Sequence, residues 1–177
     1  MNTKIIFRYL LTVLFLWSAL TTGSFASLMQ GDEIPEGELI SVEGLNYNLR
    51  DYSGKTLTVI WVTSLNPTAM NGTDNFLEIY GKYSADEVSF FIVSTINKND
   101  TLNYIQEHRI PCPVLLGGAD SFTKKLTGES GYGIDPVNNF FIFNKDGKLS
   151  RRIHLPGLPT RHIEALINQV LNQSNSN

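Results

Sequence analysis

The sequence predicts an α/β fold in which helices flank a mixed central β-sheet. Two nearly continuous apolar runs, 56–62 and 88–94, consist of β-branched and aromatic residues with little alternation, as in strands covered on both faces. A helical pattern separates these two runs. The chain then closes with a strand, a tight turn, another strand and a helix, which adds an antiparallel pair to the sheet.

Two short segments after a polar lead have the pattern of an N-terminal β-hairpin. Residues 39–42 and 45–49 flank the turn residues Glu43 and Gly44. Residues 50–55 follow as a loop that leads into the first long strand.

Helical patterns cover four segments. The first contains a proline in its first turn, where the missing N–H removes no hydrogen bond. Asn99, Asp100 and Thr101 offer caps for the second. The apolar stripe of the last stops at Leu171, and we expect a frayed polar tail beyond it. The four expected helices are 66–83, 99–108, 120–126 and 160–171.

Three further strands complete the expected order. A short one covers 113–116, and the tight turn 144–147 joins a pair at 139–143 and 148–153. There is no internal repeat and no long linker, so we expect one domain.

Residues 1–26 have the pattern of a secretory signal peptide. Lys4 and Arg8 flank the start of an apolar stretch that ends near Leu20, and small residues precede a cleavage point after Ala26. We expect export to the periplasm or to the outside of the cell. The alternative is an uncleaved membrane anchor, although the apolar stretch is shorter than the roughly 20 residues that cross a bilayer.

The remaining chain, 27–177, has the size of one domain with a sizeable core. Removal of Lys4 and Arg8 changes the formal net charge from −3 to −5, and no long basic run remains, so nucleic acid is not an expected partner. Cys112 is the one cysteine in the chain. An intramolecular disulfide or dithiol is therefore excluded.

Three segments, in this order, resemble the thioredoxin-like family. They are 49–55, with its leucine, short loop and Gly-Lys; 59–64, an apolar strand that ends in small polar residues; and 132–148, which leads into the closing hairpin. The resemblance is to the exported branch that contains the thiol reductases of cytochrome c maturation and the redoxin and peroxiredoxin relatives. It implies a single thioredoxin-like domain over 27–177.

The resemblance fails at the redox site of that family. Its two cysteines, separated by two residues, lie at the start of the first long helix, where the helix N-terminus lowers the thiol pKa. Here Leu65 and Thr68 occupy those positions, with Asn66 and Pro67 between them. Neither Leu65 nor Thr68 can form a thiolate.

The family's cis-proline also has no direct counterpart. Its position falls at Asn138, and Pro136 lies two residues earlier, where a shifted alignment would make it the cis-proline. The resemblance implies a neutral groove of amides and hydroxyls that includes Asn139, with Trp61 beneath it. Such a groove would suit the backbone of an extended polypeptide, whereas the alternative is an ordinary loop surface.

Peroxiredoxin and copper-delivery chemistry are not expected at this place. Pro67, Thr68 and Met70 resemble the peroxidatic setting, but no sulfur nucleophile is present. Pro136 occupies the position of the copper-binding histidine, and Met29 and Met70 alone would make a poor copper site. We therefore expect no metal and no cofactor.

Cys112 lies between two prolines, away from any predicted helix N-terminus. We expect it to be a half-buried structural residue; the alternatives are a reactive single thiol and an intermolecular disulfide. His108 is expected at a helix end, and His154 and His162 on the surface.

These observations predict an exported thioredoxin-like protein without a dithiol site. We expect a redox-inactive protein that binds a polypeptide or an assembly partner in the cell envelope, and that would touch a membrane only through an uncleaved signal anchor. The alternative is a thiol-dependent oxidoreductase or peroxiredoxin-like antioxidant enzyme that uses Cys112.

Overall fold

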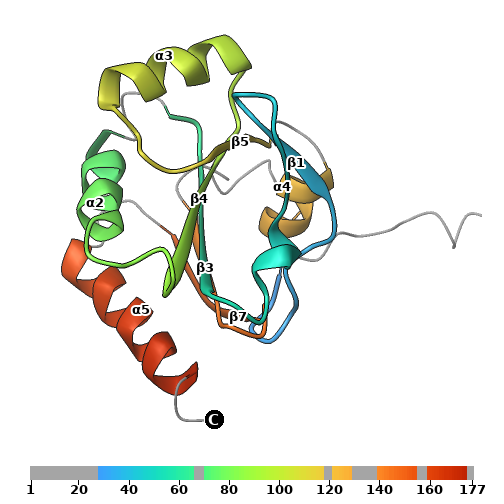
Figure 1. Ribbon diagram of the computed structural model, residues 1–177, viewed down its shortest axis with the longest axis vertical. Coiled ribbons are helices and arrows are strands. Elements are labelled where there is room, and N and C mark those ends of the chain that lie inside the picture. The colour runs from blue at the N-terminus through green and yellow to red at the C-terminus, as the bar shows by residue number, and fades with distance from the viewer. Residues whose placement is uncertain (1–27, 66–69, 118–120, 129–138, 155–158, 175–177) are drawn as a thin grey trace, which may run out of the picture.

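The computed structural model describes residues 28–65, 70–117, 121–128, 139–154 and 159–174. Within these residues a seven-stranded sheet has the order β2-β1-β5-β4-β3-β6-β7 (Figure 1). The strands are β1 (Glu38–Ser41), β2 (Asn46–Asn48), β3 (Leu57–Thr63), β4 (Val88–Ser94), β5 (Val114–Leu116), β6 (Asn139–Phe143) and β7 (Leu149–His154). The helices are η1 (Leu49–Tyr52), α2 (Met70–Tyr80), α3 (Lys98–His108), α4 (Ser121–Thr127) and α5 (Thr160–Ser174).

The sheet is mixed, as the sequence predicts. β3, β4 and β5 are parallel, and β3 and β4 pair along their whole length, from Leu57 opposite Val88 to Thr63 opposite Ser94. β6 runs antiparallel to β3, and β7 antiparallel to β6. The predicted N-terminal hairpin is present, since β1 pairs antiparallel with β2 and joins the sheet beside β5.

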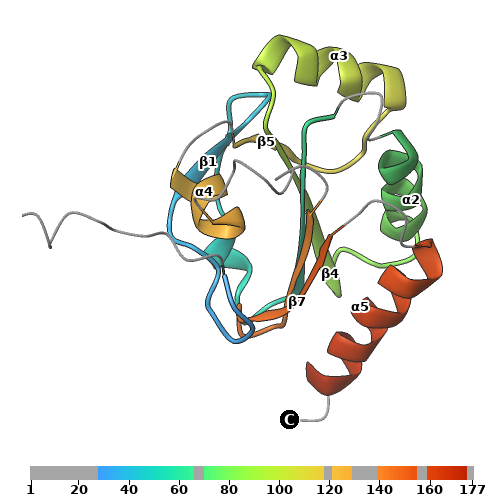
Figure 2. The ribbon, with the colours of Figure 1, turned by 180° about the vertical axis from the view of Figure 1, so that it is seen from behind.

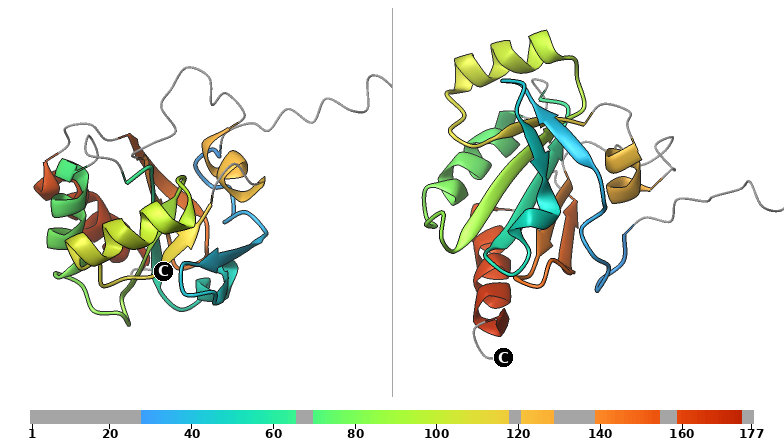
Figure 3. Two further views of the ribbon diagram at one scale, coloured as in Figure 1. Left: turned by 90° about the horizontal axis from the view of Figure 1, so that it is seen from above. Right: turned by 45° about the vertical axis from the view of Figure 1, so that its right-hand side comes forward.

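Helices cover both faces of the sheet. Figures 1 and 2 show α2 and α5 on one side of the strands and α4 on the other, and the view from above in Figure 3 separates the two layers. Alternate side chains of β3 follow this division: Val59 and Trp61 belong to the core cluster under α2, α3 and α5, and Ile60 and Val62 to the cluster under α4 and η1. Every residue of β3 is buried.

Several element boundaries differ from the sequence prediction. Residues 49–52 form a 3₁₀ turn, not a strand end and loop, because the Asn48 side chain accepts a hydrogen bond from the Arg50 N–H. The first long helix ends at Tyr80 instead of Tyr83.

The ends of α3 and α5 differ as well. Asn97, not the 99–101 segment, caps α3, with its Oδ1 accepting from the Asp100 N–H at 3.0 Å. α5 continues to Ser174 beyond the expected end at Leu171, and the Ser174 hydroxyl donates to the Val170 carbonyl.

The predicted signal peptide lies outside the described residues, as does the expected start of the first helix at 66–67. Among the helices that the structure describes, none is both long and apolar enough to cross a bilayer.

Candidate functional site

The carboxyl ends of the parallel strands β3, β4 and β5 lie at one edge of the sheet, which we call the carboxyl edge. In open α/β sheets ligands bind outside this edge, near the strand where the connections change direction. Here β3 is that strand, because the parallel strand β4 lies on one side of it and the antiparallel strand β6 on the other. The thioredoxin-like resemblance places the missing cysteines at the same edge.

Leu65, two residues after the end of β3, has a left-handed backbone conformation. Its φ of 46° is rare for a residue with a side chain, and its N–H donates to the Thr63 Oγ1 at 3.1 Å. The Leu65 side chain is 3% exposed and belongs to the core under α2. The predicted site residue is therefore at the end of β3, but it is a core residue and has no reactive group. The other aligned positions, Asn66, Pro67, Thr68 and Asn138, lie outside the described residues.

Trp61 supports this edge from within the core. Its ring is completely buried and is stacked between Phe76 and Phe140, with ring centroids 5.2 and 5.6 Å away. Gly72 of α2 lies so close that an added Cβ would be 3.1 Å from the indole. Trp61 is therefore a core residue and contributes no exposed binding surface.

Asn139 is also buried, with 1% of its surface exposed. It is the first residue of β6, and its Oδ1 accepts a hydrogen bond from the Arg152 Nε at 3.3 Å. Its amide therefore adds no exposed surface to a groove. The strand register causes this, because Asn139 pairs with Val62 and with His154 on its two sides.

Hydroxyl groups provide most of the polar contacts near the carboxyl edge. The Ser94 Oγ and Thr101 Oγ1 are 2.8 Å apart, which fixes the start of α3 on the end of β4. The Thr73 Oγ1 and Tyr104 OH are 2.7 Å apart and join α2 to α3. The Ser64 Oγ is buried and has no hydrogen-bond partner among the described residues. The Ser94, Thr101 and Thr73 side chains are buried, so these hydroxyls hold the helices at the edge and do not face a ligand, and hydroxyls of this kind do not transfer electrons.

Cys112 lies away from this edge. It precedes β5, whereas Leu65 follows β3, so the two residues are near opposite ends of the parallel strands. The thiol is in the core and 7% exposed, and burial raises its pKa from 9.0 to about 12. A reactive thiol needs the opposite shift. The geometry supports a structural role for Cys112.

The described residues contain no group of three or more histidine, cysteine or acidic side chains that could hold a metal. Met29 is 71% exposed and the Met70 side chain lies outside the described part. His108 stacks on the Tyr104 ring at 4.2 Å, and His162 is exposed in the first turn of α5.

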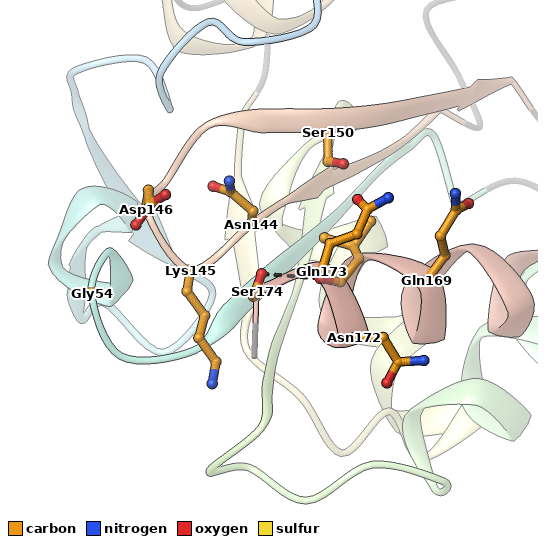
Figure 4. Close-up of a pocket in the computed structure, with 10 residues that line it drawn as sticks. Gly54, Asn144, Lys145, Asp146, Ser150, Gln169, Asn172, Gln173 and Ser174 are labelled. Carbon is orange, nitrogen blue, oxygen red and sulfur yellow. Dashed lines mark hydrogen bonds between the residues drawn. The ribbon is translucent and has the colours of Figure 1, made fainter. Parts of the chain in front are cut away.

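A hollow lies at the opposite end of β3 from the carboxyl edge. It has a volume of about 960 Å³ and is open to solvent between the β6–β7 turn and the last turns of α5. Figure 4 shows Asn144 of the β6–β7 turn and Ser150 of β7 on one side of this hollow and Gln173 of α5 on the other. Sequence reasoning missed it, because it treated the Asn, Gln and Ser residues after Leu171 as a frayed tail.

A sequence model of the Redoxin family matches residues 29–167, which is most of the chain. This chain belongs to the Redoxin family. The thiol-disulfide oxidoreductases ResA of Bacillus thuringiensis subsp. konkukian and of Bacillus cereus are each 24% identical to it over 125 residues. The match covers 70% of this chain and 68% of each relative.

Solved structures confirm the thioredoxin-like fold of this Redoxin-family protein. A putative protein disulfide isomerase from Bacteroides thetaiotaomicron aligns with a TM-score of 0.71 at 13% identity, over 84% of this chain and 94% of its own. A putative thiol:disulfide interchange protein DsbE from Chlorobium tepidum gives 0.66 at 18% identity, over 82% and 99%. A secreted disulfide oxidoreductase of Mycobacterium tuberculosis gives 0.62 at 12%, over 76% and 96%.

Proposed function

We propose that this Redoxin-family protein acts outside the cytoplasm as a redox-inactive binding protein for a polypeptide or an assembly partner. The observation that carries the proposal is the end of β3, where a buried leucine stands at the position that the resemblance gives to a cysteine. The relatives' names describe thiol-disulfide exchange, which needs two thiols or one reactive thiol. Cys112 is the one sulfhydryl in the chain, and its pKa is raised.

The carboxyl edge supports binding because it retains a rigid polar scaffold. The Thr63 carbonyl accepts from the Thr95 N–H at 3.0 Å, and the Ser94 and Thr101 hydroxyls lock α3 beside it. The Ser94 and Thr101 hydroxyls are buried, so an extended polypeptide would pair with the partly exposed residues beside them, such as Thr95 and Ile96, and would need no redox group.

Export is supported by the signal-peptide pattern of residues 1–26. One of the similar solved structures is described as secreted. The partner is therefore expected in the periplasm or outside the cell.

A disulfide-reduction assay tests the redox part of the proposal. The protein comprising residues 27–177 should reduce insulin no faster than buffer with dithiothreitol alone. The double variant Leu65→Cys/Thr68→Cys should gain measurable activity, and Leu65→Ser/Thr68→Ser is the matched control without sulfur. Reduction by the unmodified chain that Cys112→Ser abolishes would establish the thiol-enzyme alternative instead.

Photocrosslinking tests the binding part. A photoreactive amino acid at Lys98, exposed in the first turn of α3 at the carboxyl edge, should crosslink one envelope polypeptide. The same group at Asp146, exposed in the β6–β7 turn at the opposite end of β3, should not. Equal crosslinking from both positions would count against the carboxyl edge as the binding surface.

A further inference from the structure

The first half of β4 has an open edge. β5 pairs only with the second half, from Ile92 opposite Val114 to Ser94 opposite Leu116. The Ile92 N–H donates to the Pro113 carbonyl at 3.1 Å, and the Ser94 carbonyl accepts from the Gly117 N–H at 2.9 Å. Even-numbered residues of β4 therefore direct their backbone groups toward β5.

Phe90 is the next residue in this ladder, and its backbone has no partner there. In a parallel ladder the Phe90 carbonyl would accept from the N–H of residue 113, but Pro113 has none. Among the described residues nothing forms a hydrogen bond with the Phe90 N–H or carbonyl on this side. The Val88 N–H is satisfied by the Ser84 carbonyl at 3.1 Å, but its own carbonyl points toward the same open side. Unpaired backbone groups in a buried setting need water or a ligand.

A hollow of about 400 Å³ adjoins this open edge, and we call it the β4 notch. This volume is within the range of pockets that bind small ligands. Aromatic rings form its walls on both faces of the sheet. The residues that matter for binding are Tyr52, Tyr80, Tyr83, Ser89, Phe90 and Pro113.

Hydrogen bonds and ring contacts hold these walls in place. The Tyr83 OH donates to the Asn168 Oδ1 at 3.0 Å, and the Tyr80 OH donates to the Pro111 carbonyl at 3.5 Å. The Tyr80 and Tyr83 rings contact Phe90 at 5.6 and 6.0 Å. The walls are therefore already ordered before a ligand arrives, which lowers the entropy cost of binding.

We propose that the β4 notch binds a short, extended, uncharged peptide segment of another polypeptide chain. The segment would accept from the Phe90 N–H and donate to the Val88 carbonyl beside the start of β5, and its alternate side chains would lie against the tyrosines. Backbone donors and acceptors spaced as in a strand match a peptide, and no charged side chain lines the described part of the notch. This site lies at the other end of β4 from the carboxyl edge, so it is separate from the proposed function.

Nuclear magnetic resonance on the ¹⁵N-labelled chain 27–177 tests the proposal. In the free protein the Phe90 amide should exchange with solvent at least about tenfold faster than the Ile92 amide. The probe is the peptide acetyl-Thr-Tyr-Thr-Tyr-Thr-amide. It should shift the amide signals of residues 88–91 and slow the exchange of Phe90 about tenfold, whereas the same peptide with N-methylated backbone should do neither.

Two variants locate the binding. Ala85→Glu places a charge at the mouth of the notch and should weaken binding about tenfold or more. Ala165→Glu, an exposed position on α5 outside the notch, should bind like the unmodified chain. Phe90 protection equal to that of Ile92, the absence of shifts, or equal binding of the methylated peptide would overturn the proposal. None of these results depends on the insulin or Lys98 crosslinking experiments.

Discussion

The sulfur of Cys112 is held between two prolines at the entry to β5, in contact with the core under α2 and α3. Burial disfavours the thiolate because the charged form loses its hydration. The raised pKa of Cys112 is therefore a local consequence of packing. It distinguishes Cys112 from the cysteines of thiol enzymes, whose pKa is lowered.

Alkaline unfolding tests the protonation state of Cys112. The folded chain keeps the thiol protonated up to about pH 12, while the unfolded chain loses the proton near 9.0. The stabilisation is therefore complete below pH 9 and is lost as the pH rises toward 12. Between pH 9 and 11, denaturant titrations should show the free energy of unfolding falling by up to about 1.4 kcal/mol per pH unit more steeply than in Cys112→Ala.

The tyrosines, including Tyr83 with its pKa raised to about 12 by burial, titrate in both proteins, so the difference isolates Cys112. Equal slopes, together with rapid alkylation of the thiol at neutral pH, would show that the sulfur is accessible and would restore the thiol-enzyme hypothesis.

Arg109 ends α3 in the left-handed conformation, with φ of 51°. Glycine adopts this conformation without a steric cost, and Arg109 is exposed. Arg109→Gly should raise the free energy of unfolding by up to about 1 kcal/mol, measured by urea denaturation. Arg109→Ala, which keeps the Cβ, is the control and should give no such gain.

At the scale of elements, a hydroxyl pair connects the two helices over the carboxyl edge. Thr73 in α2 and Tyr104 in α3 are 2.7 Å apart in a buried setting. Thr73→Val should lower the free energy of unfolding by about 1–3 kcal/mol because it leaves the tyrosine hydroxyl without its partner. Thr73→Ser keeps the hydroxyl and should lower the free energy of unfolding by less than half as much. A larger loss in Thr73→Ser than in Thr73→Val would mean that the methyl group contributes more than the hydrogen bond.

The turn after β5 also depends on close packing. A Cβ at Gly117 would collide with the side chains of Val93 and Thr123. Gly117→Ala should therefore destabilise the fold by about 1–3 kcal/mol in thermal or urea unfolding. Gly81→Ala is a matched control, since its added Cβ would make only ordinary contacts, and a change of similar size there would argue against steric overlap as the cause.

The order of elements could be predicted because β-branched runs and helical stripes are local signals. The ends were harder, because Asn97 rather than the neighbouring polar residues caps α3 and because α5 holds its last turn with Ser174. Leu65 could be assigned to the missing cysteine position because residues 61–64 align with the family's strand just before its active site. The burial of Asn139 and the open edge at Phe90 could not be predicted, because they depend on strand order and register.

At the scale of the whole molecule, one sheet divides two apolar cores that share β3 and β4 as their common wall. β5 and the hairpin β1–β2 extend this wall on one side, and β6 and β7 on the other. A domain with this much buried surface does not need a disulfide to be stable outside the cytoplasm.

Expression of the full chain in a bacterial host tests the export proposal. The intact mass of the periplasmic product should correspond to residues 27–177, because the expected cut follows Ala26. Ala26→Leu should leave the precursor uncleaved, whereas Ser27→Thr should be processed normally. Recovery of the uncleaved full chain in the membrane fraction would support the anchor alternative.

The stacking of Trp61 between two phenylalanines has a practical consequence. The chain has two tryptophans, Trp17 and Trp61, and removal of residues 1–26 would leave Trp61 alone. The Trp61 indole is completely buried under Gly72 of α2. Its fluorescence emission should therefore be blue-shifted, and the emission maximum should move if α2 separates from the sheet. A chain of residues 27–177 would thus carry a single intrinsic fluorophore, one helix layer from the edge where we expect a partner, and binding there could be followed in real time without a label.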